Sequence, residues 1–143
     1  MNNSPKISII TVAFNSKRTI KDTIESVLAQ DYNNIEYIII DGGSSDGTKE
    51  LLKDFETNST QLKVVYLDEK GGLDKDYDRA VRSGDGNYCW LLSDDDIIED
   101  NAVLKVMTKL EDKTRDVLII NSSTWNKEYS KCFTEQNIKI SED

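Results

Sequence analysis

The chain has 143 residues, of which 37% are hydrophobic and 31% are charged, a composition typical of a soluble globular domain. Its 27 acidic residues outnumber its 18 basic residues, and a polyphosphate backbone would be repelled by the net charge of −9, so nucleic-acid binding is not expected. The chain contains no histidine, which excludes Ser-His-Asp catalysis and histidine-ligated zinc. Any chemistry must use carboxylates, hydroxyls, Lys, Arg, backbone groups or a hard metal ion.

No apolar run approaches the roughly 18 residues of a membrane span, and the first four residues do not begin a signal peptide. The two cysteines, Cys89 and Cys132, lie far apart in the sequence. They indicate neither a disulfide framework nor a zinc site, which suits the cytosol.

The first half of the chain predicts two strand-helix pairs. Residues 6–13 form a short β-branched run that predicts a buried strand, and apolar residues at helical spacing follow, with Ser16 as the expected N-cap. A second apolar strand is predicted over residues 35–40, broken by the sequence DGGSSDG. Residues 48–55 then predict a second helix.

The second half repeats this alternation. A third strand is predicted over residues 62–67, and a helix runs from Leu73 to near Gly84. A fourth strand, residues 88–92, precedes an acidic cluster, a helix over 102–110 and a fifth strand over 116–121. The pattern predicts an α/β fold, a Rossmann-like and mostly parallel sheet flanked by helices. The predicted core domain covers residues 1–121, and residues 122–143 are expected to begin an incomplete further region.

Polar residues follow four of these predicted strands. They are Asn15, Asp41, the segment Lys70 to Asp74, and Asp94 to Asp96. Because ligands of open α/β sheets bind outside the carboxyl ends of the strands, the four groups are expected at one edge. Turn formation could explain any one of them alone.

The acidic cluster of Asp94, Asp95 and Asp96 allows several interpretations. A solvated loop and a cluster complementing the helix dipole are both possible in principle, whereas a calcium loop fails because its sixth position is Glu99 rather than glycine. Three adjacent carboxylates repel one another, and a hard divalent ion would relieve that repulsion. Mg²⁺ or Mn²⁺ is typically held by one or two carboxylates together with substrate phosphates.

Three ordered segments carry a family resemblance. The opening KISIITVAFNSKRTIKDTIESVLAQDYNNIEYIIIDGGSSDGT resembles family 2 glycosyltransferases of the GT-A fold, and LLSDDD resembles their DxD region. The segment GGLDKDYDRAVRSGDGNYCWLLSDDDIIEDNAV is similar to the bacterial abequosyltransferase-like branch of surface-polysaccharide synthesis. The resemblance runs from about Lys6 to Trp125.

The resemblance implies a metal-dependent, inverting transfer of sugar from a nucleotide-diphosphate donor to a saccharide or lipid-linked saccharide. It implies a cytoplasmic location, with peripheral association with the inner face of the plasma membrane left open. It assigns nucleotide-sugar contacts to Thr11, Ala13, Asn15, Asp41, Gly42, Gly72, Asp74 and Asp94, and Mg²⁺ or Mn²⁺ to Asp95 and Asp96. Among these, Asp41 would accept the imino N–H of the base.

The chain departs from the family pattern at two places. Ser93 stands where the first aspartate of the usual acidic motif is expected, and Tyr77 and Asp78 stand where many relatives carry Arg and Asn. The catalytic base is expected outside this segment. An alternative function is a nucleotide-sugar-binding fragment without transfer activity of its own, and a purely structural interaction domain would bind neither nucleotide nor metal.

Overall fold

The structure is a computed structural model that describes residues 4–110, 118–120, 122–126, 128 and 132–134. The chain divides into two compact units, residues 1–109 and 110–143, and each is described by itself. The predicted boundary at residue 121 stays a prediction.

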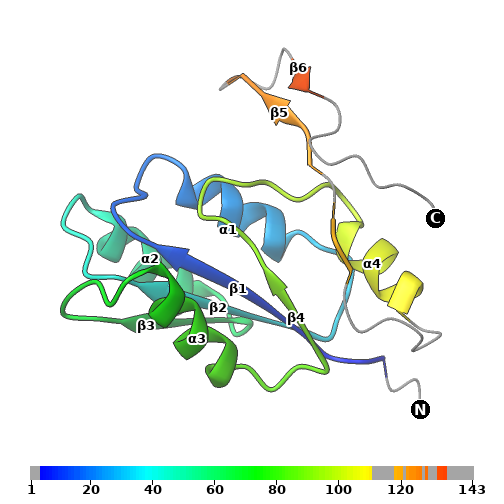
Figure 1. The fold of residues 1–143 in the computed structure, drawn as a ribbon, viewed down its shortest axis with the longest axis horizontal. Helices are drawn as coiled ribbons and strands as arrows, with labels where there is room; N and C mark the ends of the chain where they lie inside the picture. The colour runs from blue at the N-terminus through cyan, green and yellow to red at the C-terminus, as the bar shows by residue number, and fades with distance from the viewer. Residues whose placement is uncertain (1–3, 111–117, 121, 127, 129–131, 135–143) are drawn as a thin grey trace. The chain divides into compact units, whose positions relative to one another are not determined.

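The first unit is built around a four-stranded parallel sheet in the order β3-β2-β1-β4. The strands are β1 (Ile7–Ala13), β2 (Ile35–Asp41), β3 (Leu62–Tyr66) and β4 (Tyr88–Leu91). The helices are α1 (Ile20–Leu28), α2 (Thr48–Asn58), α3 (Leu73–Ser83) and α4 (Ala102–Leu110). The α/β alternation predicted from hydrophobic spacing is therefore confirmed through the fourth helix, with boundaries that differ by a few residues (Figure 1).

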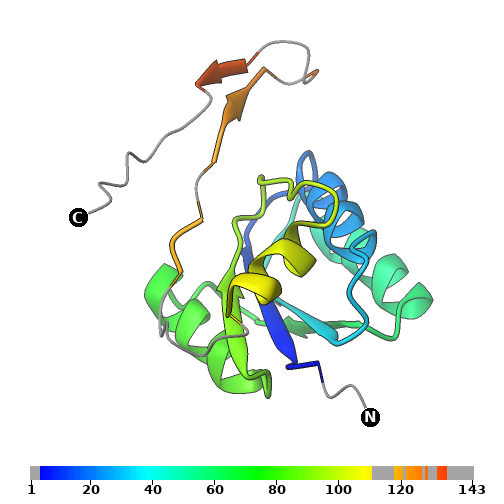
Figure 2. The ribbon, with the colours of Figure 1, turned by 90° about the vertical axis from the view of Figure 1, so that its right-hand side faces the viewer.

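Helices cover both faces of the sheet. Figure 2 shows α3 on one side and α1 with α2 on the other. On the α3 side, Ile10, Val12, Ile38 and Ile40 form a buried cluster with Ala80. The central strands β1 and β2 are buried along almost their whole length, which explains why their sequences are continuously apolar.

Strand β4 differs from the two central strands. Its residues alternate between half-buried Tyr88 and Trp90 and exposed Cys89 and Leu91. Tyr88 and Trp90 therefore contribute to the packing of the sheet.

Two sequence expectations need correction. Ser16 does not cap α1 with its side chain, because α1 begins at Ile20 and the N–H groups of Thr19 and Ile20 donate to the Ser16 carbonyl oxygen instead. The strand expected over residues 116–121 falls largely outside the described residues, and residues 118–120 have no regular secondary structure.

The second unit contains one small antiparallel pair among its described residues, β5 (Thr124–Trp125) with β6 (Cys132–Thr134). The Trp125 side chain is exposed.

Across the part of the chain that the structure describes, no helix has the length and apolar character needed to cross a membrane.

Candidate functional site

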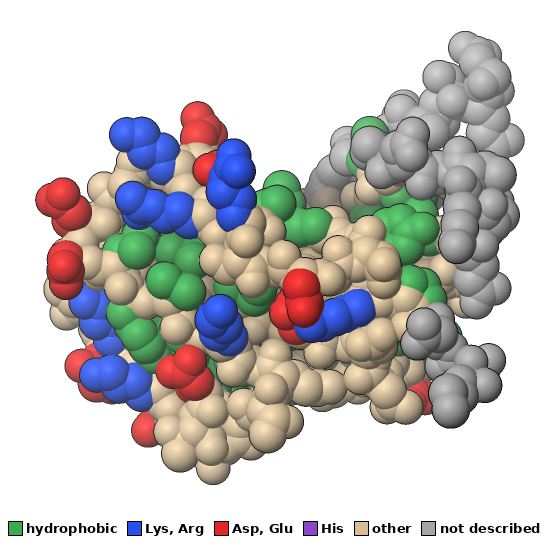
Figure 3. All heavy atoms as spheres, turned by 90° about the horizontal axis from the view of Figure 1, so that it is seen from below, with side chains coloured by type: hydrophobic (Ala, Val, Ile, Leu, Met, Phe, Trp, Pro, Cys, Tyr) green, Lys and Arg blue, Asp and Glu red, His purple; other side chains and the backbone are tan. Residues whose placement is uncertain are grey.

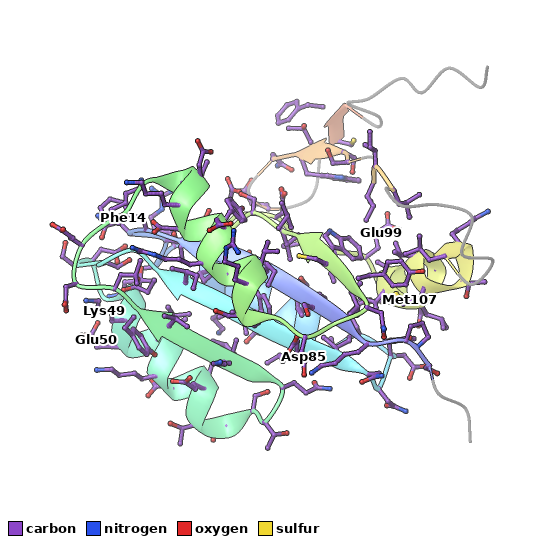
Figure 4. All side chains as sticks on the ribbon, turned by 60° about the horizontal axis from the view of Figure 1, so that its bottom comes forward. Phe14, Lys49, Glu50, Asp85, Glu99 and Met107 are labelled. Atoms are coloured by element: carbon purple, nitrogen blue, oxygen red, sulfur yellow. The ribbon has the colours of Figure 1, made fainter. Side chains whose placement is uncertain are left out.

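The four parallel strands end at one edge of the sheet, and the loops that follow them meet there. Figure 4 shows Phe14, after β1, and Lys49, on α2, at this edge, whereas Asp85 lies at the opposite end of the sheet. On the face drawn in Figure 3, basic and acidic side chains mix around a hydrophobic area at the same end. Cationic groups are therefore available beside the strand ends.

Asp41 ends β2 and is fully buried. Its Oδ2 accepts a hydrogen bond from the Ser44 N–H at 3.2 Å and lies 3.9 Å from Lys49 Nζ. Its Oδ1 has no hydrogen-bond partner among the residues that the structure describes. An unpaired polar atom in a protein interior is costly and calls for an explanation. A ligand N–H aimed at Oδ1 would supply the missing partner.

The loops after β1 and β2 are joined by hydrogen bonds. The Asn15 N–H donates to Ser44 Oγ at 2.9 Å, and the Ser45 N–H donates back to Asn15 Oδ1 at 2.9 Å. The Ser16 N–H donates to Thr48 Oγ1 at 3.0 Å. Asn15 adopts a left-handed backbone conformation, with φ of 55°, which Asn tolerates better than most residues. The serines after Asp41 thus hold the β1–α1 loop, and the Asn15 side chain is engaged in that contact.

The segment GSSDG, residues 43–47, can be interpreted as a turn with a helix cap or as a phosphate site, and a phosphate site needs a basic partner. The structure brings Lys17 there: its Nζ would lie 2.8 Å from a Cβ placed on Gly47. Gly47 also has φ of 99°, a backbone conformation that favours glycine at this position. The Lys17 N–H donates to Asp46 Oδ2 at 3.1 Å, which fixes the two loops together.

Thr11 and Ala13, on β1, are both fully buried. Thr11 Oγ1 lies 3.0 Å from Tyr37 Oη in a buried hydrogen bond. Burial raises the pKa of Tyr37 above its ordinary value, and the nearby Asp94 carboxylate adds to the effect, partly offset by the Thr11 hydrogen bond. The Thr11 hydroxyl is therefore held inside the sheet and is not exposed at its edge. Ala13 contributes its carbonyl oxygen to that edge.

Gly42 lies where three segments of the chain meet. A Cβ at Gly42 would lie 3.5 Å from the Ala13 carbonyl oxygen, 3.6 Å from Lys70 Cγ and 3.7 Å from Asp76 Oδ2. After β3, Gly72 has φ of 99° and open space around it. Asp74 follows in the first turn of α3 and is exposed. Gly42 and Gly72, both predicted as site residues, thus lie in the loops after β2 and β3 that border this edge of the sheet.

The acidic cluster after β4 is tied to the β1–α1 loop. Ser16 Oγ donates a hydrogen bond to Asp94 Oδ2, and Ser93 Oγ donates to Asp95 Oδ1 at 2.6 Å. Partial desolvation, followed by the charges of Asp95 and Asp94, raises the pKa of Asp96 above its ordinary value. The three carboxylates therefore crowd one another, as the sequence predicts.

Tyr77, on α3, faces this cluster. Burial raises the pKa of its phenol, with further contributions from the Asp94, Asp96 and Asp95 charges. Within the described ranges, no group of three or more His, Cys, Asp or Glu side chains is arranged to hold a metal ion. Mg²⁺ and Mn²⁺ bound with nucleotide substrates use only one or two carboxylates, which Asp95 and Asp96 would supply.

Sequence reasoning missed several residues of this edge. Phe14 is 41% exposed, and Lys70 Nζ lies 4.5 Å from its ring centre. Asp76 is fully buried on α3, and its Oδ1 lies 3.3 Å from Arg79 Nη1. Its Oδ2 has no hydrogen-bond partner in the described part of the chain. An aromatic residue directly before Asn15 was a readable signal for Phe14. The burial of Asp76 had none, because α3 is otherwise rich in exposed charge.

A shallow depression lies beside Arg79. Its other lining residues are Leu67, Asp68 and Glu69. None of the predicted site residues lines it, so it adds nothing to the site built above.

A parallel sheet of this order, with polar groups gathered at the carboxyl ends of its strands, is an open α/β architecture whose ligands bind at that edge. The family model for Glycosyl transferase family 2 matches residues 8–141. The chain belongs to that family, and its members are glycosyltransferases. The predicted GT-A type of fold is confirmed.

Individual relatives agree with this assignment. The chain is 28% identical over 118 residues to Glycosyltransferase GlyG of Streptococcus pneumoniae serotype 4, covering 82% of this chain and 39% of GlyG. It is 34% identical over 96 residues to the poly-beta-1,6-N-acetyl-D-glucosamine synthase of Staphylococcus epidermidis, covering 67% of this chain and 23% of the synthase. Relatives of the chain therefore include a polysaccharide synthase, and the chain spans well under half the length of either relative.

A solved structure shows the same fold with a donor bound. The structure of S. aureus TarS 1-349 in complex with UDP-GlcNAc matches with a TM-score of 0.67 and 26% identity, covering 76% of this chain and 31% of the TarS chain. The likeness places the parallel sheet of this chain among nucleotide-sugar-binding glycosyltransferase domains.

Proposed function

We propose that this protein transfers a sugar from a nucleotide-diphosphate donor to a saccharide or lipid-linked saccharide acceptor. The observation that carries the proposal is the unpartnered Oδ1 of Asp41, fully buried where β2 ends. A nucleobase presents N–H groups in its plane, and a carboxylate oxygen accepts from them. Ligand binding would thus give the unpaired Asp41 Oδ1 a charge-assisted hydrogen bond.

The surrounding residues are suited to the rest of the donor. Phe14 is 41% exposed, and its ring would stack on the base once the Lys70 ammonium group over it is displaced; base–aromatic stacking is worth about 1–3 kcal/mol. Gly72, which has open space around it, would let the ribose and diphosphate approach the backbone after β3, and Gly42 would lie beside the donor after β2. Thr11, Ala13 and Asn15 shape the floor by holding β1 and its loop in place, and Asp74 would lie beside the ribose.

The acidic cluster is proposed to hold Mg²⁺ or Mn²⁺ together with the donor diphosphate. Asp95 would bind the ion, helped by Asp96, with Asp94 beside the ribose and the ion. The bound ion supplies Lewis-acid stabilisation of the charge that develops on the leaving nucleoside diphosphate. The chain's own contribution is to orient Asp94 and Asp95, through the hydroxyls of Ser16 and Ser93, close to the base pocket.

The role of the acceptor in the reaction is proposed from the family resemblance. Attack of an acceptor hydroxyl on the anomeric carbon, assisted by a carboxylate base outside this segment, would invert the configuration at that carbon. The segment from Gly71 to Val103 supports placement near the abequosyltransferase-like branch and a role in bacterial surface-polysaccharide synthesis. Donor nucleotide-sugars would be met on the cytoplasmic side, at or near the inner face of the plasma membrane.

A second candidate function is donor binding without transfer. It is favoured by the fraction of GlyG that the chain matches, 39%. The two functions differ in one measurement: both predict nucleotide binding, and only the first predicts release of nucleoside diphosphate when acceptor is added to this chain.

The test is the thermal stability of the chain against UDP, GDP, CDP and dTDP, each with Mn²⁺ and with EDTA. A single-site ligand at 100 times its dissociation constant stabilises a protein by about 2.7 kcal/mol, a readable shift. We expect one nucleotide to raise the melting temperature more than the others, and more strongly with Mn²⁺. Equal melting temperatures in every condition would overturn the proposed donor site.

A further inference from the structure

Ser16 occupies an unusual position at the candidate site. It is only 7% exposed, and each of its polar groups is engaged. Its N–H donates to Thr48 Oγ1 at 3.0 Å, and its carbonyl oxygen accepts from the N–H groups that open α1. Both the backbone and the side chain of Ser16 are therefore fixed in the β1–α1 loop.

The hydrogen bonds of the Ser16 hydroxyl have a defined direction. Its oxygen accepts from the Phe14 N–H at 3.1 Å, and its proton is donated to Asp94 Oδ2. A serine hydroxyl has only one proton, so the acceptor role toward Phe14 leaves that proton free for the carboxylate. Ser16 is separated from Asp94 by 78 positions in the sequence. The contact thus joins the loop after β1 to the loop after β4.

The contact acts on one oxygen of Asp94 and leaves the other available. Among the described residues, Asp94 Oδ1 has no hydrogen-bond partner. Hydrogen bonds to an ionised carboxylate are short, directional and about twice as strong as neutral ones. The buried hydroxyl therefore sets the direction in which the free oxygen of Asp94 points.

From this geometry we infer that Ser16 is a positioning residue: it orients Asp94 for the metal and ribose of the donor, which rests on the proposed function. Its second effect is to couple the acidic cluster to the base pocket. The same loop carries Phe14 and is held by Ser44, whose N–H donates to Asp41. A displacement of Asp94 would therefore also displace the β1–α1 loop that borders the base.

A simply structural role for Ser16 makes a different prediction. The Ser16 backbone contacts to Thr48 and α1 survive substitution of the side chain, so Ser16→Ala removes only the links to Phe14 and Asp94. If the hydroxyl served folding alone, its loss would lower stability without changing how nucleotide binding depends on metal. If it serves Asp94, its loss would act on the metal-dependent part of nucleotide affinity.

The experiment measures affinity for the best nucleotide of the panel by calorimetry, with Mn²⁺ and with EDTA, for Ser16→Ala, Asp94→Asn and the double variant. Loss of a hydrogen bond to a charged group predicts about tenfold weaker binding with Mn²⁺ for Ser16→Ala, and a change of less than about twofold with EDTA. In the Asp94→Asn background, Ser16→Ala should add almost nothing, because residues that act through one contact are not additive. Ser16→Thr keeps the hydroxyl and should retain metal-dependent binding.

Ser83→Ala serves as the control, since its exposed hydroxyl donates only to the Arg79 carbonyl oxygen within α3. Wild-type protein that binds no nucleotide in any condition would overturn the proposed function and the role of Ser16 with it. Wild-type binding with an unchanged Mn²⁺ affinity in Ser16→Ala, or additive effects in the double variant, would overturn the role of Ser16 alone. A melting scan of each unliganded variant identifies any loss of nucleotide affinity that is caused by unfolding. If Ser16→Ala is unfolded, the metal-dependent affinities of Ser16→Thr and Asp94→Asn decide whether the hydroxyl acts through Asp94.

Discussion

Lys70 Nζ lies 4.5 Å from the centre of the Phe14 ring, so a cation covers the exposed face of the aromatic residue that follows β1. The aliphatic stem of the same lysine lies against Gly42, next to Asp41. Cation–π contacts at exposed sites are worth only about 0.5–1 kcal/mol. A nucleobase can therefore displace the ammonium group from the ring at little cost, and the displaced cation would remain close to a bound diphosphate.

Phe14→Leu should weaken nucleotide binding about tenfold, both with Mn²⁺ and with EDTA, because base stacking does not depend on the metal. Leucine keeps an apolar side chain but loses the aromatic face. Calorimetric titration with the preferred nucleoside diphosphate measures the effect. Phe133→Leu, at an exposed aromatic residue of the second unit, is the matched control. Equal affinities of Phe14→Leu and wild type would show that the base does not stack on Phe14.

Asp41→Asn should weaken nucleotide binding at least tenfold even without metal. The substitution keeps the side-chain volume but can place an NH₂ group toward the base, where the carboxylate accepted an N–H. Because the carboxylate is fully buried beside Lys49, the same change leaves that lysine without its charged partner, and stability must be measured in parallel. Affinities in EDTA, corrected for the folded fraction, are the readout. Unchanged affinity would remove Asp41 from the base pocket.

The architecture was readable from the sequence because hydrophobic spacing reports burial directly. Strands β1 and β2 are central and fully covered, so their sequences are continuously apolar, and the helices keep one apolar stripe. The same logic placed Asp41 and Asp94 at one edge, since parallel strands end together.

The contacts that build the site were not readable in this way. The Ser16–Asp94 and Asn15–Ser45 hydrogen bonds join residues far apart in the sequence, and only the fold decides their distance. Ser16 was expected to cap α1 because a serine before a helix usually does so. Here α1 starts later, and the hydroxyl is drawn to a carboxylate from another loop. The tertiary contact between Ser16 and Asp94 therefore outweighs the local preference of serine for a capping position.

Tyr37→Phe should lower the free energy of unfolding by about 1–3 kcal/mol. The substitution removes the hydroxyl that lies 3.0 Å from Thr11 Oγ1 inside the sheet and leaves the buried Thr11 hydroxyl without that partner. Urea denaturation followed by circular dichroism measures the change. Thr11→Val in the Tyr37→Phe background should recover part of the loss, because two apolar groups then replace a broken polar pair. A Tyr37→Phe variant as stable as wild type would mean that Thr11 finds another partner.

Asp96→Asn should stabilise the metal-free chain at neutral pH. The pKa of Asp96 is raised from its ordinary value of 3.8 by partial desolvation and then by Asp95 and Asp94, so the folded chain holds this proton more tightly than the unfolded chain does. Stability is therefore lost as the pH rises from the ordinary value through the raised one, and the loss persists at neutral pH. Asparagine cannot ionise and avoids it. The advantage of Asp96→Asn should shrink as the pH falls toward 3.8.

Asp78→Asn is the control for that pH dependence, because its sign is opposite. The hydrogen bond from Arg82 lowers the pKa of Asp78, so Asp78 contributes stability at neutral pH that disappears as the pH falls through its lowered value. Melting temperatures of both variants from pH 3 to pH 8, in EDTA, should diverge from wild type in opposite directions at neutral pH. Adding Mn²⁺ with nucleotide should then favour wild type over Asp96→Asn, since ligand binding relieves the repulsion that the substitution removes. An Asp96→Asn variant no more stable than wild type at neutral pH would show that the three carboxylates do not strain the loop.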